Sequence, residues 1–230
     1  MKSLLQTSIY VLFCLSTLSC QEVNEPWIQL IDGENLDGWE VKNGTANFEI
    51  VNGTIIGTTK MDTPNTFLCT TQDYDDFILE FEVRVDSAIN SGVQFRSNSL
   101  KEYNDGQVHG YQAEVDPSKR AWSGGIYEEG KRGWLYNLEK NEAGRKAFKN
   151  GEWNHYRIEA IGNRLAIWVN GINTANLDDD ETSLGFIGLQ VHSIGKKKHS
   201  GKKVEWRNIK IITNNPEKYV RQTTAPLIQT

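Results

Sequence analysis

Cysteine is scarce in this sequence, and its scarcity limits how the fold can be held together. The 230 residues include three cysteines, Cys14, Cys20 and Cys69. We expect the first two to lie in a processed N-terminal segment, which leaves Cys69 alone and allows no internal disulfide. A hydrophobic core must therefore stabilise the domain, and Cys69 is interpreted as a small buried apolar residue.

One apolar run lies near the N-terminus, and it is too short for a retained membrane span. A lysine precedes the run at residues 4–18, and a serine and Cys20 follow it. This order predicts a bacterial lipoprotein signal peptide over residues 1–20, with lipidation at Cys20. The lipid on Cys20 would anchor the protein to a membrane of the cell envelope, in the periplasm or on the outer surface, and residues 21–26 would form the tether to the domain. An ordinary secretion signal is the alternative, because Thr17 stands where leucine is usual.

Positive charge is in deficit, with 25 Lys and Arg against 30 Asp and Glu and a net charge of −5. A mildly acidic chain is a poor partner for nucleic acid. The sequence also lacks a Gly-Lys-Ser/Thr phosphate loop, a Gly-x-Ser-x-Gly turn and a dinucleotide fingerprint. Cysteine ligands and His-x-x-x-His spacing are missing, which argues against a closed zinc site. An open site for a hard divalent metal ion, with Glu114 and His192 as ligands, is left as one interpretation.

Helical periodicity is weak, whereas strand patterns recur along the chain. Residues 77–85 alternate apolar and polar side chains, which indicates a strand with one buried face. Two Asn-Gly pairs, at 52–53 and 170–171, stand between such runs and predict tight hairpin turns. Many short strands without intervening helices predict an all-β sandwich of two antiparallel sheets. We place it in one domain over residues 27–213, followed by a C-terminal tail at 214–230.

Three of the predicted strands, at residues 92–96, 111–116 and 188–192, carry their polar residues at alternate positions. Successive side chains of a strand point to opposite faces, so each strand has one apolar and one polar face. If the three strands share a sheet, its polar face carries amides, carboxylates, a guanidinium and an imidazole. This composition predicts a binding or catalytic surface for a polar ligand such as a sugar, carried by Gln94, Arg96, Gln112, Glu114, Asp116, Gln190 and His192.

The carboxylates are the main catalytic candidates. Glu114 and Asp116 are two residues apart on one strand, so they share a face, and Glu129 follows a glycine-rich turn. Paired carboxylates can divide acid and base roles in glycoside cleavage, or one can act as a base beside a charge-stabilising group. His192 is a further candidate acid or base. The alternative is that Glu114 and Asp116 form ion pairs with Arg96 that only hold strands together.

An ordered series of motifs resembles the 3-keto-disaccharide hydrolase domain family, formerly catalogued as a domain of unknown function. The series covers residues 27–39, 91–96, 110–116, 124–129, 152–156, 168–171, 185–192 and 206–209. The resemblance implies a concanavalin A-like jelly roll, an exported location and action on glycosides oxidised at C3. It also implies dependence on a glycoside 3-oxidoreductase that supplies the ketone. One departure is Glu128, which stands where we expect a smaller residue.

The chemistry implied by this resemblance starts at the proton on C2, which a ketone at C3 makes acidic. Glu114, Asp116 or His192 would remove the proton, and Glu129 would protonate the leaving oxygen on C1 before water adds. Arg96, Gln190 or a divalent ion would stabilise the enolate. The residues expected to bind the substrate are Gln94, Arg96, Gln112, Trp122, Tyr127 and Gln190.

Two other functions fit the same residues. One is a non-catalytic carbohydrate-binding module of the same fold, in which Trp122, Tyr127 and Trp134 stack against sugars. The other is a conventional glycoside hydrolase that uses Glu114 and Glu129 as an acid–base pair on an unoxidised glycan.

Overall fold

The computed structural model describes residues 25–230. The predicted signal peptide and the lipidation site Cys20 lie outside the described residues. From residue 25 onward, no helix combines the length and apolar character needed to cross a membrane.

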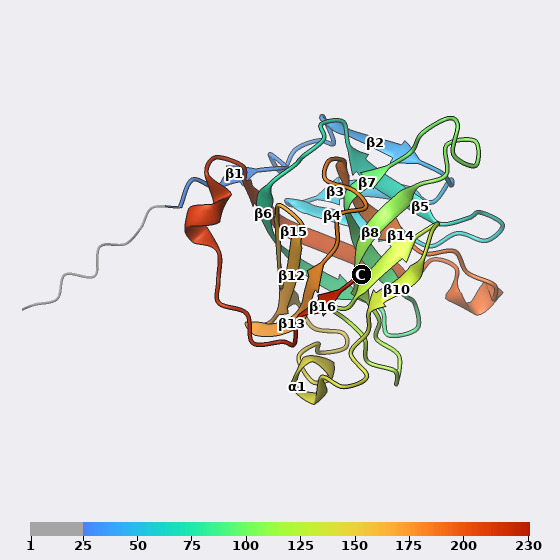
Figure 1. The fold of residues 1–230 in the computed structure, drawn as a ribbon. Coiled ribbons are helices and arrows are strands. Elements are labelled where there is room, and N and C mark those ends of the chain that lie inside the picture. The colour runs from blue at the N-terminus through green and yellow to red at the C-terminus, as the bar shows by residue number, and fades with distance from the viewer. Residues whose placement is uncertain (1–24) are drawn as a thin grey trace, which may run out of the picture.

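Two sheets pack face to face and form a sandwich (Figure 1). Sheet A runs in the order β16 (Ile228–Gln229), β13 (Ile172–Asp178), β12 (Arg164–Val169), β11 (Asn154–Ile161), β6 (Phe77–Val85), β15 (Lys203–Ile212), β4 (Thr54–Thr58) and β3 (Asn47–Val51), with β1 (Ile28–Gln29) also paired to β15. Sheet B runs in the order β10 (Gly133–Tyr136), β9 (Ile126–Glu129), β8 (His109–Val115), β7 (Ser91–Asn98), β14 (Phe186–Val191), β5 (Thr66–Thr70) and β2 (Trp39–Lys42).

Neighbouring strands are antiparallel except for the short pairing of β13 with β16. The predicted hairpins are present, with β3 joined to β4 and β12 joined to β13 at the two Asn-Gly turns. Helical structure is limited to α1 (Glu142–Arg145) and the 3-10 turns η1 (Lys197–His199) and η2 (Pro216–Tyr219) within the described residues. The predicted all-β class and antiparallel two-sheet architecture are therefore confirmed.

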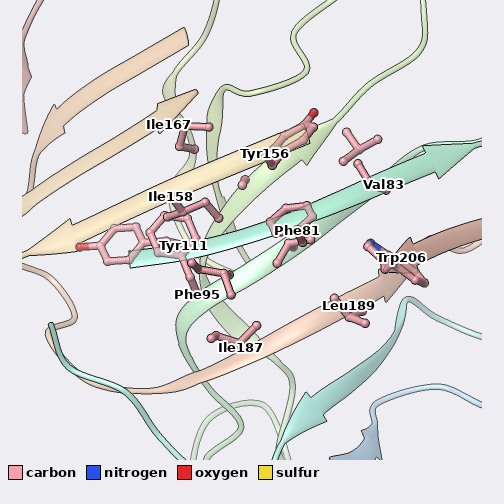
Figure 2. Packing of buried hydrophobic residues seen from close by; sticks show 14 of the residues in the cluster. Phe81, Val83, Phe95, Tyr111, Tyr156, Ile158, Ile167, Ile187, Leu189 and Trp206 are labelled. Carbon is pink, nitrogen blue, oxygen red and sulfur yellow. The ribbon is translucent and has the colours of Figure 1, made fainter. Parts of the chain in front are cut away.

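Alternation along the strands builds the core between the sheets (Figure 2). In β6 the apolar positions of the predicted pattern are at most 1% exposed. Phe81 of β6 stacks on Tyr156 of β11 with ring centroids 5.2 Å apart, and Phe95 of β7 stacks on Tyr111 of β8 at 5.6 Å. Burial of these aromatic side chains contributes much of the hydrophobic stabilisation of the domain, in which Cys69 of the described residues is unpaired.

The same alternation sends the polar positions of sheet B to its outer face. Gln94 of β7 lies opposite Gln112 of β8, and Gly92 lies between Glu114 of β8 and Gln190 of β14. A Cβ atom on Gly92 would come within 2.4 Å of the Gln112 side chain. A glycine is therefore required here, because the Gln112 side chain lies across β7.

Part of this outer face is covered by a small apolar cluster of Phe67, Cys69, Val108 and Phe186. The backbone N–H of Val108 donates to the side-chain oxygen of Asn43, 3.0 Å away, which ties the start of β8 to the loop after β2. Cys69 is fully buried in this cluster, as its interpretation as a small apolar residue predicts. Its burial raises the pKa of the thiol, so Cys69 is a poor nucleophile.

The C-terminal tail lies along the outside of sheet A (Figure 1). The Arg157 guanidinium donates to the carbonyl oxygen of Tyr219 at 2.6 Å, and the backbone N–H of Arg221 donates to Glu159 at 3.0 Å. At its end β16 pairs with β13. Residues 214–230 therefore form a strap with defined contacts.

Candidate functional site

A hollow of about 290 Å³ opens on the outer face of sheet B. Its lining is mostly polar and includes amides, carboxyl groups, a guanidinium, an imidazole and two aromatic rings. The lining residues are Asn65, Asn90, Gln112, Glu114, Arg120, Tyr127, Glu129, Trp134 and His192. Five of the predicted site residues line this hollow, namely Gln112, Glu114, Tyr127, Glu129 and His192. Trp134 also lines it.

Glu114 is the most deeply buried carboxyl group of the hollow and is 4% exposed. Its backbone is fixed by hydrogen bonds from its own N–H to the Gly125 oxygen and from the Tyr156 hydroxyl to its carbonyl oxygen, both 3.0 Å long. Asn90 donates to one carboxyl oxygen at 2.6 Å, and Gln112 donates to the other at 2.9 Å. Burial raises the pKa of Glu114 to about 7, against the opposing effect of these two hydrogen bonds. A carboxyl group with such a pKa can accept a proton at neutral pH.

A chain of side-chain hydrogen bonds leads to Glu114. The Ser97 hydroxyl donates to the Gln94 oxygen at 2.8 Å, and the Gln94 nitrogen donates to the Gln112 oxygen at 2.6 Å. Gln112 then donates to Glu114. Gln94 is fully buried, so it orients Gln112 from behind and does not line the hollow as its predicted role in substrate binding requires.

Glu129, the second carboxyl group of the hollow, lies against amides and an imidazole. Asn65 donates to one oxygen at 2.9 Å, and Gln190 approaches the other at 3.5 Å. Burial raises the pKa of Glu129, although the Asn65 hydrogen bond and nearby His192 oppose the shift. His192 places Nδ1 2.7 Å from the Ser193 carbonyl oxygen. A carbonyl oxygen only accepts hydrogen bonds, so Nδ1 carries the proton and Nε2 of neutral His192 keeps its lone pair.

Gln190 forms part of the layer beneath the hollow. Its side chain is fully buried in β14, and its amide oxygen has no hydrogen-bond partner within residues 25–230. Gln190 therefore supports Glu129, and it does not line the hollow.

Arg96 does not reach the hollow, contrary to its predicted place on the polar face. A bulge between Phe95 and Asn98 shifts the pairing of β7 with β8, and Arg96 has a φ of +45°. The Arg96 guanidinium instead donates to Asp76 at 2.8 Å and to the carbonyl oxygens of Asp75 and Gly162 at 2.7 and 2.6 Å. A bulge ends strict alternation, which explains the error. The observed partners of Arg96 also exclude the alternative in which Arg96 forms ion pairs with Glu114 and Asp116.

Replacing Arg96 with Met should therefore affect stability and leave the site intact. The Arg96 side chain is 1% exposed, and its loss would leave two backbone carbonyls and one carboxylate without their donor. We expect the free energy of unfolding to fall by about 2–4 kcal/mol, with activity per folded molecule unchanged. Urea unfolding and an activity assay at low temperature measure both. Loss of activity in fully folded protein would contradict this structural role.

Asp116 holds the side chain of Arg120, a lining residue of the hollow that was not predicted from the sequence. Asp116 is 3% exposed and does not line the hollow. One carboxylate oxygen accepts the Arg120 Nε–H at 2.8 Å, and the other accepts the backbone N–H of Ser118 at 3.1 Å. The Arg120 guanidinium also lies over the indole rings of Trp122 and Trp134, 4.8 and 5.0 Å from their centroids. Trp122 thus supports the wall of the hollow and does not line it, so its predicted stacking against sugar is not supported by its position.

Asn65 and Asn90 were missed as well. Asn65 immediately precedes β5, and Asn90 immediately precedes β7, so neither belongs to the alternating part of a strand. The short Asp-x-x-x-Arg spacing of Asp116 and Arg120 after a strand could have indicated Arg120. The two asparagines have no comparable sequence signal.

The side chains of the hollow are poorly suited to bind a divalent metal ion. In the described part of the chain, no group of three or more His, Cys, Asp or Glu side chains could hold a metal ion. Both oxygens of Glu114, which was predicted to pair with His192 as a ligand, already accept hydrogen bonds from amide groups.

The fold and the hollow together indicate a protein with a carbohydrate-related function. A sandwich of this kind, with amides, carboxyl groups and aromatic rings around an open hollow, suits a ligand rich in hydroxyl groups. Residues 26–212 match the sequence profile of the 3-keto-alpha-glucoside-1,2-lyase-like domain. The chain belongs to this family, which confirms the resemblance found in its motifs. No curated protein sequence matches it.

Several solved structures share the fold. A Parabacteroides distasonis protein provisionally assigned as a glycosyl hydrolase is 16% identical with a TM-score of 0.59, and the match covers 82% of this chain and 94% of that one. The carbohydrate-binding module CBM66 of Bacillus subtilis is 20% identical with a TM-score of 0.55, over 75% of this chain and 93% of that one. A galectin-like protein of unknown function from Bacillus subtilis is 9% identical with a TM-score of 0.55, over 77% and 90%.

Proposed function

We propose that this protein cleaves 3-keto-glycosides, with elimination of the C1 substituent followed by addition of water. The observation that carries the proposal is Glu114, a buried carboxyl group with a pKa raised to about 7 in a hollow that also contains Glu129. An ordinary glycoside offers such a base no acidic carbon proton, whereas a ketone at C3 acidifies the proton on C2.

Glu114 takes the C2 proton, and the electron pair of the C2–H bond forms the C2=C3 bond of an enolate with its charge on O3. When the C3=O bond re-forms, this pair moves to make C1=C2. The C1–O pair leaves with the glycosidic oxygen, which takes a proton from Glu129. Water then adds to C1, its proton returns to Glu129, and Glu114 gives its proton back to C2. The sum of these steps is hydrolysis.

The environments of both carboxyl groups suit proton transfer. Glu114 accepts hydrogen bonds only from neutral amides, which leave a reactive carboxylate when it is ionised. Burial also raises the pKa of Glu129, so this carboxyl group holds a proton more readily than an exposed glutamate does. His192 lines the same hollow and offers a second proton acceptor for the water step.

The proposal also includes the cellular location of the protein and the source of its substrate. The sequence pattern of residues 1–20 supports lipidation at Cys20 and attachment to a membrane of the cell envelope. The ketone must come from an oxidation at C3, so a glycoside 3-oxidoreductase would act before this protein.

A comparison of one glucoside with its 3-keto derivative tests the proposal. We expect release of the C1 substituent from the keto form alone, followed by chromatography or by the absorbance of a chromogenic leaving group. Cleavage of both compounds would indicate a conventional hydrolase using Glu114 and Glu129. Binding without turnover, measured by calorimetry, would indicate a carbohydrate-binding module.

A further inference from the structure

Arg120 is the arginine that faces the hollow, and most of its hydrogen-bonding capacity is unused. A guanidinium has five N–H groups, of which Arg120 donates the one on Nε to Asp116 at 2.8 Å. Its Nη2 lies 3.9 Å from a Glu114 oxygen, which is beyond hydrogen-bond distance. The four N–H groups on Nη1 and Nη2 therefore have no hydrogen-bonded acceptor within residues 25–230.

The guanidinium is nevertheless held in one place. Trp122 and Trp134 meet at an interplanar angle of 80°, and Arg120 lies over both rings. Asp116 fixes the Nε edge of the guanidinium from a buried position. A cation held by a carboxylate and two aromatic rings does not need to reorganise when a negative charge forms beside it.

The backbone next to Arg120 adopts an unfavourable conformation. Ala121 has a φ of +55°. In the described chain, all other non-glycine residues with positive φ are Asn or Asp, except Arg96. Alanine gains nothing in this region, so such strain persists only where surrounding contacts impose it, and it is concentrated at functional sites.

We propose that Arg120 is a catalytic residue that stabilises the enolate oxygen formed when Glu114 removes the C2 proton, with Asp116 as its positioning residue. This inference rests on the proposed function. In the step concerned, the C2–H bond breaks, the proton passes to Glu114, and negative charge develops on O3. The free N–H groups of Arg120 lie beside Glu114, where they can donate to that oxygen. Arg120 thus takes the enolate-stabilising role that was expected of Arg96.

A substrate analogue without a leaving group isolates this step. The 3-keto form of 1,5-anhydroglucitol has no glycosidic oxygen at C1, so the protein can exchange its C2 proton but has no C1 leaving group to expel. In deuterated buffer, the loss of the C2 proton signal in NMR spectra measures enolate formation directly. We expect Arg120→Gln to slow this exchange, and to lower kcat for cleavage of a 3-keto-glucoside, by about 10²–10³-fold.

Three variants make the test specific. Arg120→Lys keeps the charge but not the paired N–H geometry, and should recover only part of the exchange rate. Asp116→Asn leaves Arg120 present but poorly held, so we expect an intermediate loss. Arg145→Gln, an exposed arginine on α1, should change nothing. The Arg120 side chain is 42% exposed, so the Arg120 variants should fold, and circular dichroism checks the folding of every variant, including that of buried Asp116.

The outcomes are distinguishable. Unchanged C2 exchange in Arg120→Gln, with only a higher KM for cleavage, would show that Arg120 binds substrate and would overturn its catalytic role. If the unmodified protein neither exchanges nor cleaves the keto compounds, the proposed function fails and the role of Arg120 falls with it. Slow exchange in Arg120→Gln and normal exchange in Arg145→Gln would support the assignment.

Discussion

Glu114→Gln is expected to lower the turnover of a 3-keto-glucoside by about 10²–10⁴-fold, the usual contribution of a general base. Glutamine has the same shape as glutamate and still offers an oxygen to Asn90 or Gln112, but it cannot take the C2 proton. Exchange of that proton in deuterated buffer should fall by a similar factor. Kinetics with the keto compound and NMR exchange measure the two effects.

The pH dependence should identify Glu114 as the group responsible. Burial raises its pKa to about 7, so the rate of C2 proton exchange, which does not need the proton of Glu129, should rise with pH and reach a plateau above that value. Glu114→Gln should lose this rise. A pH–rate profile that keeps the same rise in the variant would assign the base to another group, with His192 the first candidate.

The same pKa shift has a consequence for stability, opposite in sign to that of an ordinary ion-paired carboxylate. Between its unfolded value of 4.5 and about 7, Glu114 binds a proton in the folded protein but not in the unfolded chain. Stability must therefore fall as pH rises through this window, by about 3 kcal/mol in total. Glu114→Gln should remove this fall. Glu49→Gln, at an exposed position on β3 of sheet A, should retain both the activity and the pH dependence.

The fold could be predicted from the sequence because its strands carry local information. Two Asn-Gly turns and the alternation in β6 depend on neighbouring residues, and both are present in the structure. The same rule correctly placed Gln112 and Glu114 on one face of β8. Turn positions and strand faces depend on adjacent residues, so they could be predicted from the sequence alone.

The remaining parts of the site depend on breaks in that regularity. The bulge in β7 turns Arg96 toward Asp76, and the end of β8 lets Asp116 turn toward Arg120. Asn65 contacts Glu129 although 64 residues separate them in the sequence. Such contacts arise from strand order and loop closure, which alternation alone does not specify. The sequence therefore identified much of the polar face of sheet B, but not the cation that lies on it.

Asp179 connects several segments that support the wall of the hollow. Its carboxylate accepts two hydrogen bonds from Arg132, at 2.8 and 2.9 Å, and further ones from the hydroxyl groups of Tyr111 and Thr230. Arg132 lies in the turn between β9 and β10 and also donates to Glu128. Because β9 and β10 carry Tyr127, Glu129 and Trp134, Asp179 ties the lining of the hollow to β8 and to the end of the chain.

Asp179→Asn is therefore expected to lower the free energy of unfolding by about 2–3 kcal/mol, because it weakens several hydrogen bonds to a charged group while Arg132, which is 38% exposed, keeps access to water. Burial alone would raise the pKa of Asp179, but hydrogen bonds from Arg132, Thr230 and Tyr111 outweigh it and hold the pKa well below its usual 3.8. The stabilisation is thus present above pH 3.8 and is lost as pH falls below it, so the unmodified protein should lose more stability in acid than Asp179→Asn.

Urea unfolding between pH 2 and 6 measures this difference, and amide hydrogen exchange should show faster opening of residues 126–136 in Asp179→Asn. The neighbouring exposed residue gives the matched control, since Asp180→Asn removes the same charge without these contacts. Equal losses in the two variants would mean that net charge, and not the Asp179 contacts, sets the effect. A large loss confined to Asp179→Asn, with faster exchange in β9 and β10, would show that the strands carrying Tyr127, Glu129 and Trp134 depend on a carboxylate outside the hollow.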